Sequence, residues 1–277
     1  MSTDTPNTQS PDAPVLTSID ARGIATITLN RPAVNNAYDG AMIDGLLKAG
    51  PALAGDAAVR AIVIRGNGRH FQAGADLQWI RSIPRGDDAA NLAVSRATAL
   101  ALRQLDGAGK PTIALVQGAC IGGGTGIIAS CDIVVAERTA SFAISEARWG
   151  LTAAVIFPQL NAAIGVRQVR RYALSCERFD ATRAQAIGLV HELCEPGMLD
   201  AAAAPIIDSL LTAAPDSIAR TKLGAMRCAG TLIDDADFER LVAEHAAKRQ
   251  SDEALEGLAS FDEKRAPRWY APAQRRP

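Results

Sequence analysis

The sequence contains little of what several classes of protein need. Its 29 lysines and arginines are balanced by 30 aspartates and glutamates. The resulting net charge of −1 argues against a general nucleic-acid binder, which needs a basic excess to neutralise phosphates. No apolar run reaches the about 18 residues that span a bilayer, and the polar segment 1–14 lacks the basic-then-apolar order of a signal peptide. We therefore predict a cytoplasmic protein with a disordered leader over 1–14 and with no nucleic-acid or membrane partner.

Histidine and cysteine are also too sparse to build a metal centre. The three histidines occur in no known ligand spacing, and the five cysteines are widely separated without a C-x-x-C pair. A chain of 277 residues does not need a disulfide framework for stability. We predict reduced cysteines in or near the core and no metal site, so the chemistry must come from other residues.

The hydrophobic fraction of 48% predicts a folded chain, and its pattern predicts an α/β fold. The segment 24–29 alternates like a strand with one buried side, and continuous apolar runs predict strands buried on both faces. Asp39 is a candidate cap for a helix with apolar residues at the 3.6 period. The further predicted elements are strands at 61–64, 112–116 and 132–136 and a helix over 88–107. Strands alternating with helices at this interval indicate a layered α/β core.

The composition changes from about residue 200 to alanine-rich helices with few strand formers, the last of them capped by Ser251. We therefore divide the chain into an α/β core over 15–205 and a helical region over 206–277. The helical region is too small to bury a core of its own, so we expect it to pack on the α/β core or on another subunit.

Two glycine-containing loops are the candidate functional segments. One is 70–77, which follows a buried strand and turn, and the other is 122–124, which lies at a strand-to-helix junction. Glycine there suggests that the main chain approaches a ligand closely and presents a free N–H to it. Two such donors are what a developing oxyanion needs. Neither the phosphate-loop motif nor the dinucleotide-binding fingerprint is present.

These loops belong to an ordered set of motifs that resembles the crotonase (enoyl-CoA hydratase/isomerase) superfamily and covers roughly residues 15–270. The matching segments are Asn30-Arg31-Pro32 with Asn36-Ala37, Phe71 to Leu77, Gly118 to Gly124 with Cys131-Asp132, Phe142 to Glu146 with Gly150-Leu151, Ala184 to Val190, and Glu256-Gly257 with Phe261, Lys264-Arg265 and Pro267. In detail the pattern is most similar to the methylglutaconyl-CoA and isohexenylglutaconyl-CoA hydratases.

The resemblance implies a spiral of ββα turns, a C-terminal helical region that forms trimers or hexamers of two trimers, and an acyl-CoA substrate. Coenzyme A is then part of the substrate thioester, and no separate cofactor is implied. The two oxyanion donors fall on the backbone N–H groups of Ala75 and Gly123. The residues expected to contact CoA or the acyl chain are Val34, Asn35, Gln72, Ala73, Asp76, Leu77, Gly122, Gly126 and, at the CoA phosphates, Lys264.

The catalytic carboxylates are where this sequence departs from the family pattern. Hydratases of the family use two glutamates; the second matches Glu146, whereas the first falls on Gly126. Apolar neighbours are expected to raise the pKa of Glu146 towards neutrality. One carboxylate suffices for hydration of an enoyl thioester if water bridges it to both carbons, and it also suffices for isomerisation of the double bond. A non-catalytic scaffold or RNA-binding protein is the third alternative.

Two features bear on the acyl group. Glycine at position 126 is expected to open space for a branched or bulky chain. The hydratases with the most similar pattern act on acyl groups that carry a carboxylate of their own, and we expect Arg81 or Arg148 to hold it.

Overall fold

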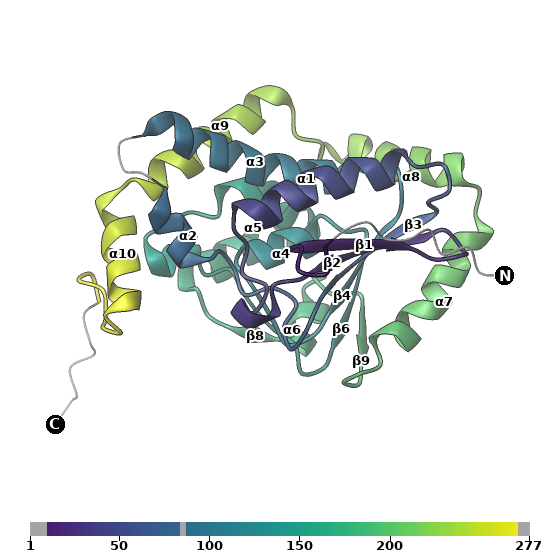
Figure 1. Ribbon diagram of the computed structural model, residues 1–277, viewed down its shortest axis with the longest axis horizontal. Coiled ribbons are helices and arrows are strands. Elements are labelled where there is room, and N and C mark those ends of the chain that lie inside the picture. Colours follow the sequence, from purple (N-terminus) through teal and green to yellow (C-terminus); the bar gives the residue numbers. More distant parts are fainter. Residues whose placement is uncertain (1–9, 84–86, 271–277) are drawn as a thin grey trace.

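Two β-sheets organise the chain in the computed structural model, which describes residues 10–83 and 87–270 (Figure 1). The larger sheet has the order β1-β2-β3-β4-β6-β9, and the smaller one has the order β5-β7-β8. The strands are β1 (Val15–Ile19), β2 (Ile24–Leu29), β3 (Ala61–Gly66), β4 (Thr112–Val116), β5 (Ala119–Ile121), β6 (Ile133–Glu137), β7 (Ser141–Ala143), β8 (Phe179–Asp180) and β9 (Glu192–Cys194). In the larger sheet only the β1–β2 pair is antiparallel.

The hydrophobic pattern of the strands follows from their positions in the larger sheet. The central strand β4 is buried at every residue, which explains its continuous apolar run. Strand β2 alternates more, because it lies next to the edge strand β1. The strands predicted from the sequence at 24–29, 61–64, 112–116 and 132–136 all form, within a few residues of the expected limits.

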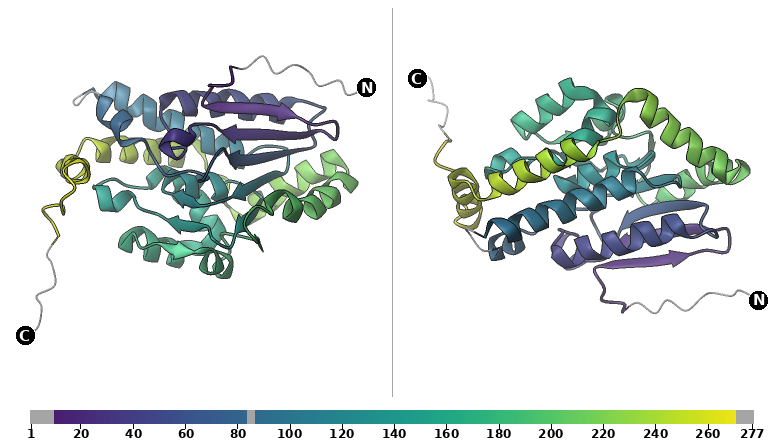
Figure 2. Two further views of the ribbon diagram at one scale, coloured as in Figure 1. Left: turned by 60° about the horizontal axis from the view of Figure 1, so that its bottom comes forward. Right: turned by 90° about the horizontal axis from the view of Figure 1, so that it is seen from above.

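Helices cover both faces of the larger sheet. They are α1 (Gly40–Gly55), α2 (Leu77–Ser82), α3 (Asp88–Asp106), α4 (Gly123–Ala129), α5 (Phe157–Ser175), α6 (Ala181–Ala186), α7 (Leu199–Thr212), α8 (Pro215–Ala229), α9 (Asp235–Arg249) and α10 (Asp252–Asp262). One face packs against α1, α3, α4, α5 and α9, and the other against α7 (Figures 1 and 2). The predicted caps are confirmed: Asp39 accepts from the Met42 N–H of α1, and Ser251 accepts from the Ala254 N–H of α10.

The connection from one sheet to the other repeats along the chain. Strand β4 is followed at once by the short strand β5 of the second sheet and then by α4, and β6 is followed in the same way by β7. This is the spiral of ββα turns expected from the resemblance, and the fold prediction is confirmed.

The chain differs from the expected division at two places. The expected boundary at 205 lies inside α7, whose residues Leu199 and Ala203 are buried against the larger sheet, so the core continues through this helix. At the other end, residues 1–9 of the expected leader lie outside the described residues. Residues 10–14 are ordered, because the Asn30 side chain donates to the carbonyls of Pro11 and Ala13.

Three absences hold within the described ranges. No helix there is both long and apolar enough to cross a membrane. All five cysteines, each of them described, are free thiols. No cluster of three or more His, Cys, Asp or Glu side chains in the described part of the chain is arranged to hold a metal ion.

Candidate active site

A cavity of about 730 Å³ brings the two glycine loops together. Its walls come from the loop before α1, the loop before α2, the start of α4, the 3₁₀ helix η2 (Glu146–Trp149), and residues of α3, α9 and α10. Most of the site residues predicted from the sequence line it, namely Val34, Asn35, Ala73, Ala75, Asp76, Leu77, Gly122, Gly123 and Glu146.

The first glycine loop is shaped by a buried glutamine. The Gln72 side chain is fully buried; its amide NH₂ donates to the Gly74 carbonyl and its amide oxygen accepts from the Gly74 N–H. Gly74 has a φ of 93°, which favours glycine. The next residue, Ala75, pairs with Tyr38 through hydrogen bonds from the Tyr38 N–H to Gly74 and from the Asp76 N–H to Tyr38. No acceptor among the described residues takes the Ala75 N–H itself, and Ala75 lines the cavity.

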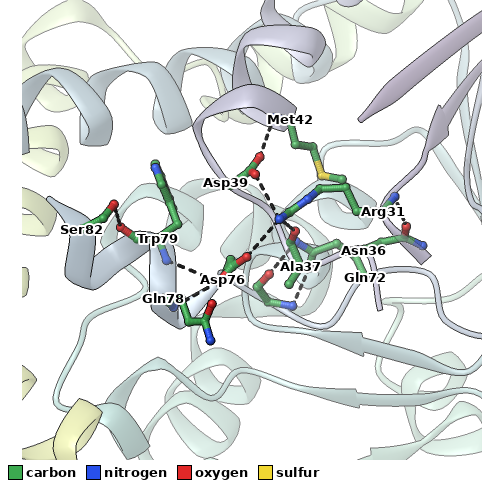
Figure 3. Close-up of polar contacts among 11 residues, drawn as sticks. Arg31, Asn36, Ala37, Asp39, Met42, Gln72, Asp76, Gln78, Trp79 and Ser82 are labelled. Carbon is green, nitrogen blue, oxygen red and sulfur yellow. Dashed lines mark hydrogen bonds and ion pairs between the residues drawn. The ribbon is translucent and has the colours of Figure 1, made fainter. Parts of the chain in front are cut away.

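An ion-pair cluster around Arg31 holds the 70–77 loop in place (Figure 3). One guanidinium nitrogen of Arg31 lies 3.0 Å from Asp76 Oδ2 and 3.1 Å from Asp39 Oδ2. Asp76 in turn caps α2 by accepting from the N–H groups of Gln78 and Trp79. Asn36, fully buried, donates to the carbonyls of Asn67 and His70. The Asn-Arg-Pro motif and the asparagine after it thus position the loop rather than contact the cavity contents.

The second glycine loop leaves no room for side chains. Gly122 has a φ of 55°. A Cβ on Gly123 would lie 2.7 Å from Cε1 of Tyr38, and a Cβ on Gly124 would lie 2.7 Å from Oε1 of Gln72. Gly123 is the first residue of α4, so its N–H has no partner within the helix, and no other described residue accepts it.

The two loops face each other across a short gap. A Cβ on Gly122 would lie 3.7 Å from the Cα of Gly74, and the Tyr38 residue that pairs with Ala75 places its ring against Gly123. The free N–H groups of Ala75 and Gly123 therefore belong to neighbouring segments of the same cavity wall.

Glu146 places a carboxyl group beside these loops. Its Oε1 lies 3.1 Å from the position of a Cβ on Gly122, and its Oε2 is buried with no hydrogen-bond partner in the described structure. Burial raises the pKa of Glu146 to about 7, and the nearby backbone N–H groups of Glu146 and Ser145 only partly offset this effect. This agrees with the raised pKa of Glu146 that the sequence predicts. The carboxyl group can therefore both accept and donate a proton near neutral pH.

Three of the predicted binding residues do not line the cavity. Gln72 supports the first loop from inside the protein and does not line the cavity. The space beside Gly126 is closed rather than open, because a Cβ there would lie 2.4 Å from Cγ2 of Ile156, which itself lines the cavity. Lys264 is exposed just after α10 and is not a lining residue, so its contact with CoA phosphates stays a prediction.

The arginines expected to hold an acyl carboxylate are both found at the cavity. Arg81 is already paired with Asp262 and donates to the Leu258 carbonyl. Arg148 is exposed and lies over the Trp149 ring. The sequence reasoning missed a second polar group, consisting of Tyr38, His245 and Arg249. The signal available was the spacing of His245 and Arg249 on one face of a helix, but that spacing does not identify the element they face.

Comparison with known proteins agrees with this geometry. The family model of the enoyl-CoA hydratase/isomerase family matches residues 20–272. The chain is 32% identical to mevalonyl-coenzyme A hydratase sidH of Aspergillus fumigatus, covering 92% of this chain and 94% of that protein. It is 28% identical to a mitochondrial Delta(3,5)-Delta(2,4)-dienoyl-CoA isomerase of Dictyostelium discoideum, covering 90% and 88%.

Among solved structures, an enoyl-CoA hydratase from Mycobacterium avium is 34% identical and superposes with a TM-score of 0.82, covering 94% of this chain and 100% of that one. The sequence match and the shared fold both extend over nearly the whole chain. The chain therefore belongs to the enoyl-CoA hydratase/isomerase family of enzymes.

Proposed function

We propose that the protein adds water across the 2,3 double bond of an enoyl-CoA thioester, with Glu146 as its acid and base. The supporting observation is that two free backbone N–H groups and one buried, unpaired carboxyl group line the same cavity. Each part alone has a structural explanation, but their convergence on one cavity matches the needs of a reaction through an enolate.

In this proposal the thioester oxygen accepts hydrogen bonds from the N–H groups of Ala75 and Gly123. Negative charge grows on that oxygen when the enolate forms, so the two donors stabilise the transition state more than the substrate. The pantetheine arm passes the exposed side chain of Val34 and the adjacent Asn35 and Ala73 at the cavity wall.

Glu146 then performs both proton transfers. Ionised Glu146 removes a proton from a water molecule while the oxygen of that water bonds to C3, and the electron pair of the double bond moves onto the thioester as an enolate. The protonated carboxyl group next delivers its proton to C2, and Glu146 returns to its starting state. A pKa of about 7 suits a group that must gain and lose the same proton in each cycle.

Glu146 is the only carboxylate without an ion-pair partner among the described residues that line the cavity, since Asp76 pairs with Arg31 and Asp262 pairs with Arg81. A single carboxylate favours a second candidate, an isomerase in which Glu146 carries a proton between C4 and C2. Both reactions use the same N–H pair, and they differ only in whether water bonds to carbon.

One experiment separates the two reactions. The protein is incubated in heavy-oxygen water with a 2-enoyl-CoA and, separately, with the 3-enoyl-CoA of equal length. A hydratase converts the 2-enoyl thioester and incorporates the label at C3, whereas an isomerase interconverts the two thioesters without label. Glu146→Gln is expected to lower kcat by about 1,000-fold in either case, while Glu192→Gln, an exposed glutamate on β9, leaves it unchanged.

Turnover by Glu146→Gln within a few-fold of wild type would refute the catalytic assignment. Binding of CoA thioesters without any turnover would instead support the non-catalytic scaffold.

A further inference from the structure

The cavity wall contains a charged group that the proposed reaction does not use. Arg249 is only 8% exposed, and it lines the cavity together with His245 from the same helix. Helix α9 places both residues there by lying alongside α3 (Figure 2). A guanidinium buried to this extent normally has an anionic partner, because removing an unpaired charge from water is costly.

Arg249 has no anionic partner among the described residues. Its Nη2 donates to the Asn91 carbonyl at 2.6 Å, and its Nε is buried with no hydrogen-bond partner. No Asp or Glu of the described chain forms an ion pair with it. Burial lowers the pKa of Arg249, while the nearby Tyr38 acts in the opposite direction. The site therefore has an unsatisfied donor and an uncompensated positive charge.

The groups around Arg249 are suited to an anion and not to a further cation. His245 is hydrogen-bonded through Nδ1 to Ser95 Oγ at 2.9 Å, and burial, with the charge of Arg249, lowers its pKa to about 3. Its ring is thus neutral at physiological pH. Burial and the charge of Glu146 raise the pKa of Tyr38 to about 12, so its hydroxyl keeps its proton and can donate to a ligand.

Tyr38 also connects this group with the reaction centre. Its ring edge lies against Gly123. The charge of Glu146 raises the pKa of the Tyr38 hydroxyl, and the charge of Arg249 lowers it. An acyl chain whose thioester oxygen accepts from Ala75 and Gly123 therefore shares one cavity with the Tyr38 side chain and with Arg249. The space beside Gly126 is closed by Ile156, whereas His245 and Arg249 bring polar groups to the cavity wall from α9.

We propose that Arg249, with Tyr38 and His245 beside it, binds a carboxylate at the distal end of the acyl chain, so that the substrate is the CoA thioester of a short unsaturated dicarboxylic acid. This inference rests on the proposed function for the placement of the thioester. It assigns the carboxylate to Arg249 and not to Arg81, whose guanidinium already has a carboxylate partner.

The test compares two ligands that differ only in the terminal charge. One is a five-carbon 2-enoyl-CoA ending in a carboxylate, and the other ends in the corresponding primary amide. The wild type is expected to prefer the acid by at least about thirtyfold in kcat/KM, the range for a desolvated charge pair. Arg249→Met should abolish the preference, and Arg249→Lys should retain part of it because the charge remains without the planar fork. Arg240→Met, an exposed arginine on α9, is the matched control and should keep the full preference.

Binding of the saturated acid and amide thioesters, measured by calorimetry, gives the same comparison without chemistry. If the acid binds more tightly but neither enoyl thioester is hydrated, the proposed function fails and the carboxylate subsite stands. If the wild type binds both thioesters equally, or if a folded Arg249→Met keeps the preference, the subsite is refuted. Should Arg249→Met not fold, the wild-type comparison and Arg249→Lys still decide the question.

Discussion

Burial of the Glu146 carboxyl group sets the pH range in which it can act as a base. Its pKa is raised from 4.5 to about 7, so the group is mostly protonated at pH 6 and ionised at pH 8. We predict that kcat/KM for hydration falls about tenfold for each pH unit below 7 and is level just above it. The measurement is a pH–rate profile from pH 5.5 to 8.5, with stability checked at each pH. A level profile down to pH 5.5 would contradict the role of Glu146 as the base.

The same pKa shift affects stability with a definite sign. Between pH 4.5 and 7 the folded protein holds a proton on Glu146 that the unfolded chain releases, so this group destabilises the fold as the pH rises through that window. Glu146→Gln, which is always neutral, should therefore melt at a higher temperature than wild type at pH 8 and at nearly the same temperature at pH 4.5. This comparison tests the burial of Glu146 independently of its activity.

Gly126 occupies the position on which the resemblance places the first of the two glutamates, and the structure has no room for a side chain there. A side chain at 126 would meet Ile156, whose Cγ2 lies 2.4 Å from the position that a Cβ would take. We predict that Gly126→Ala destabilises the protein by about 1–3 kcal/mol, the usual cost of overpacking, although alanine is the better helix former. Ile156→Leu removes the clashing methyl group, so the double variant should recover part of this loss. The measurement is a double-mutant cycle of unfolding free energies; additive effects would refute the steric explanation.

Helix α10 approaches the catalytic segment more closely than side chains would allow. Gly257 on α10 faces η2, which begins at Glu146, and a Cβ on Gly257 would lie 2.2 Å from the Trp149 carbonyl oxygen. On the other side of the contact, a Cβ on Gly150 would lie 2.1 Å from the Glu253 carbonyl oxygen. Glycine in the Glu256-Gly257 motif therefore sets the distance between this helix and the carboxyl group of the site.

We predict that Gly257→Ala displaces η2 and lowers both stability and kcat. The clash is with backbone, which cannot rotate away, so the loss of about 1–3 kcal/mol exceeds the gain in helix propensity of about 1 kcal/mol. Thermal melting and hydratase assays measure the two effects. Gly55→Ala at the end of α1, where a Cβ meets nothing within 4 Å, is the control and should be neutral or slightly stabilising. A Gly257→Ala protein with wild-type melting and turnover would contradict this account.

The sequence predicts those elements that are marked by a local pattern, such as a continuous apolar run or a helix cap. The apolar runs of β3 and β4 and the Asp39 and Ser251 caps need no knowledge of distant residues. The edge strand β1 is not predicted by its pattern, because it is short and mostly half-exposed or exposed. Helix α4 starts at Gly123, inside the run of three glycines. Glycine is a poor helix former, so residue preferences do not predict a helix start there.

The candidate site divides in the same way. The glycine loops and Glu146 could be located because each lies in a recognisable motif, and the structure brings them to one cavity. The closed space at Gly126 depends on Ile156, and the setting of Arg249 depends on the packing of α9 against α3. These long-range contacts leave no periodicity or composition signal, so the acyl end of the cavity could not be predicted from the sequence.

Helix α8 is the most weakly covered α-helix in the described part of the chain, since none of its residues is fully buried. Helix α8 has apolar residues on one side, including Ile218, Leu223 and Met226, yet none of its residues is buried. Its Lys222 side chain donates to Asp132 and to the Lys110 carbonyl, which attaches the helix to the core. An amphipathic helix whose apolar side is only partly covered within the chain is expected to bury the rest of that side against another subunit.

We therefore expect the chain to form a trimer, or a hexamer of two trimers, through its C-terminal helices. Light scattering on the purified protein should give about three or six times the chain mass of 29.0 kDa. Met226→Glu places a charge on the apolar side of α8 and should lower the measured mass, because an unpaired charge is costly to bury at an interface. Arg220→Gln, on the exposed side of the same helix, should not change it. A wild-type mass of a single chain at micromolar concentration would exclude the assembly, and it would leave the apolar side of α8 in contact with solvent.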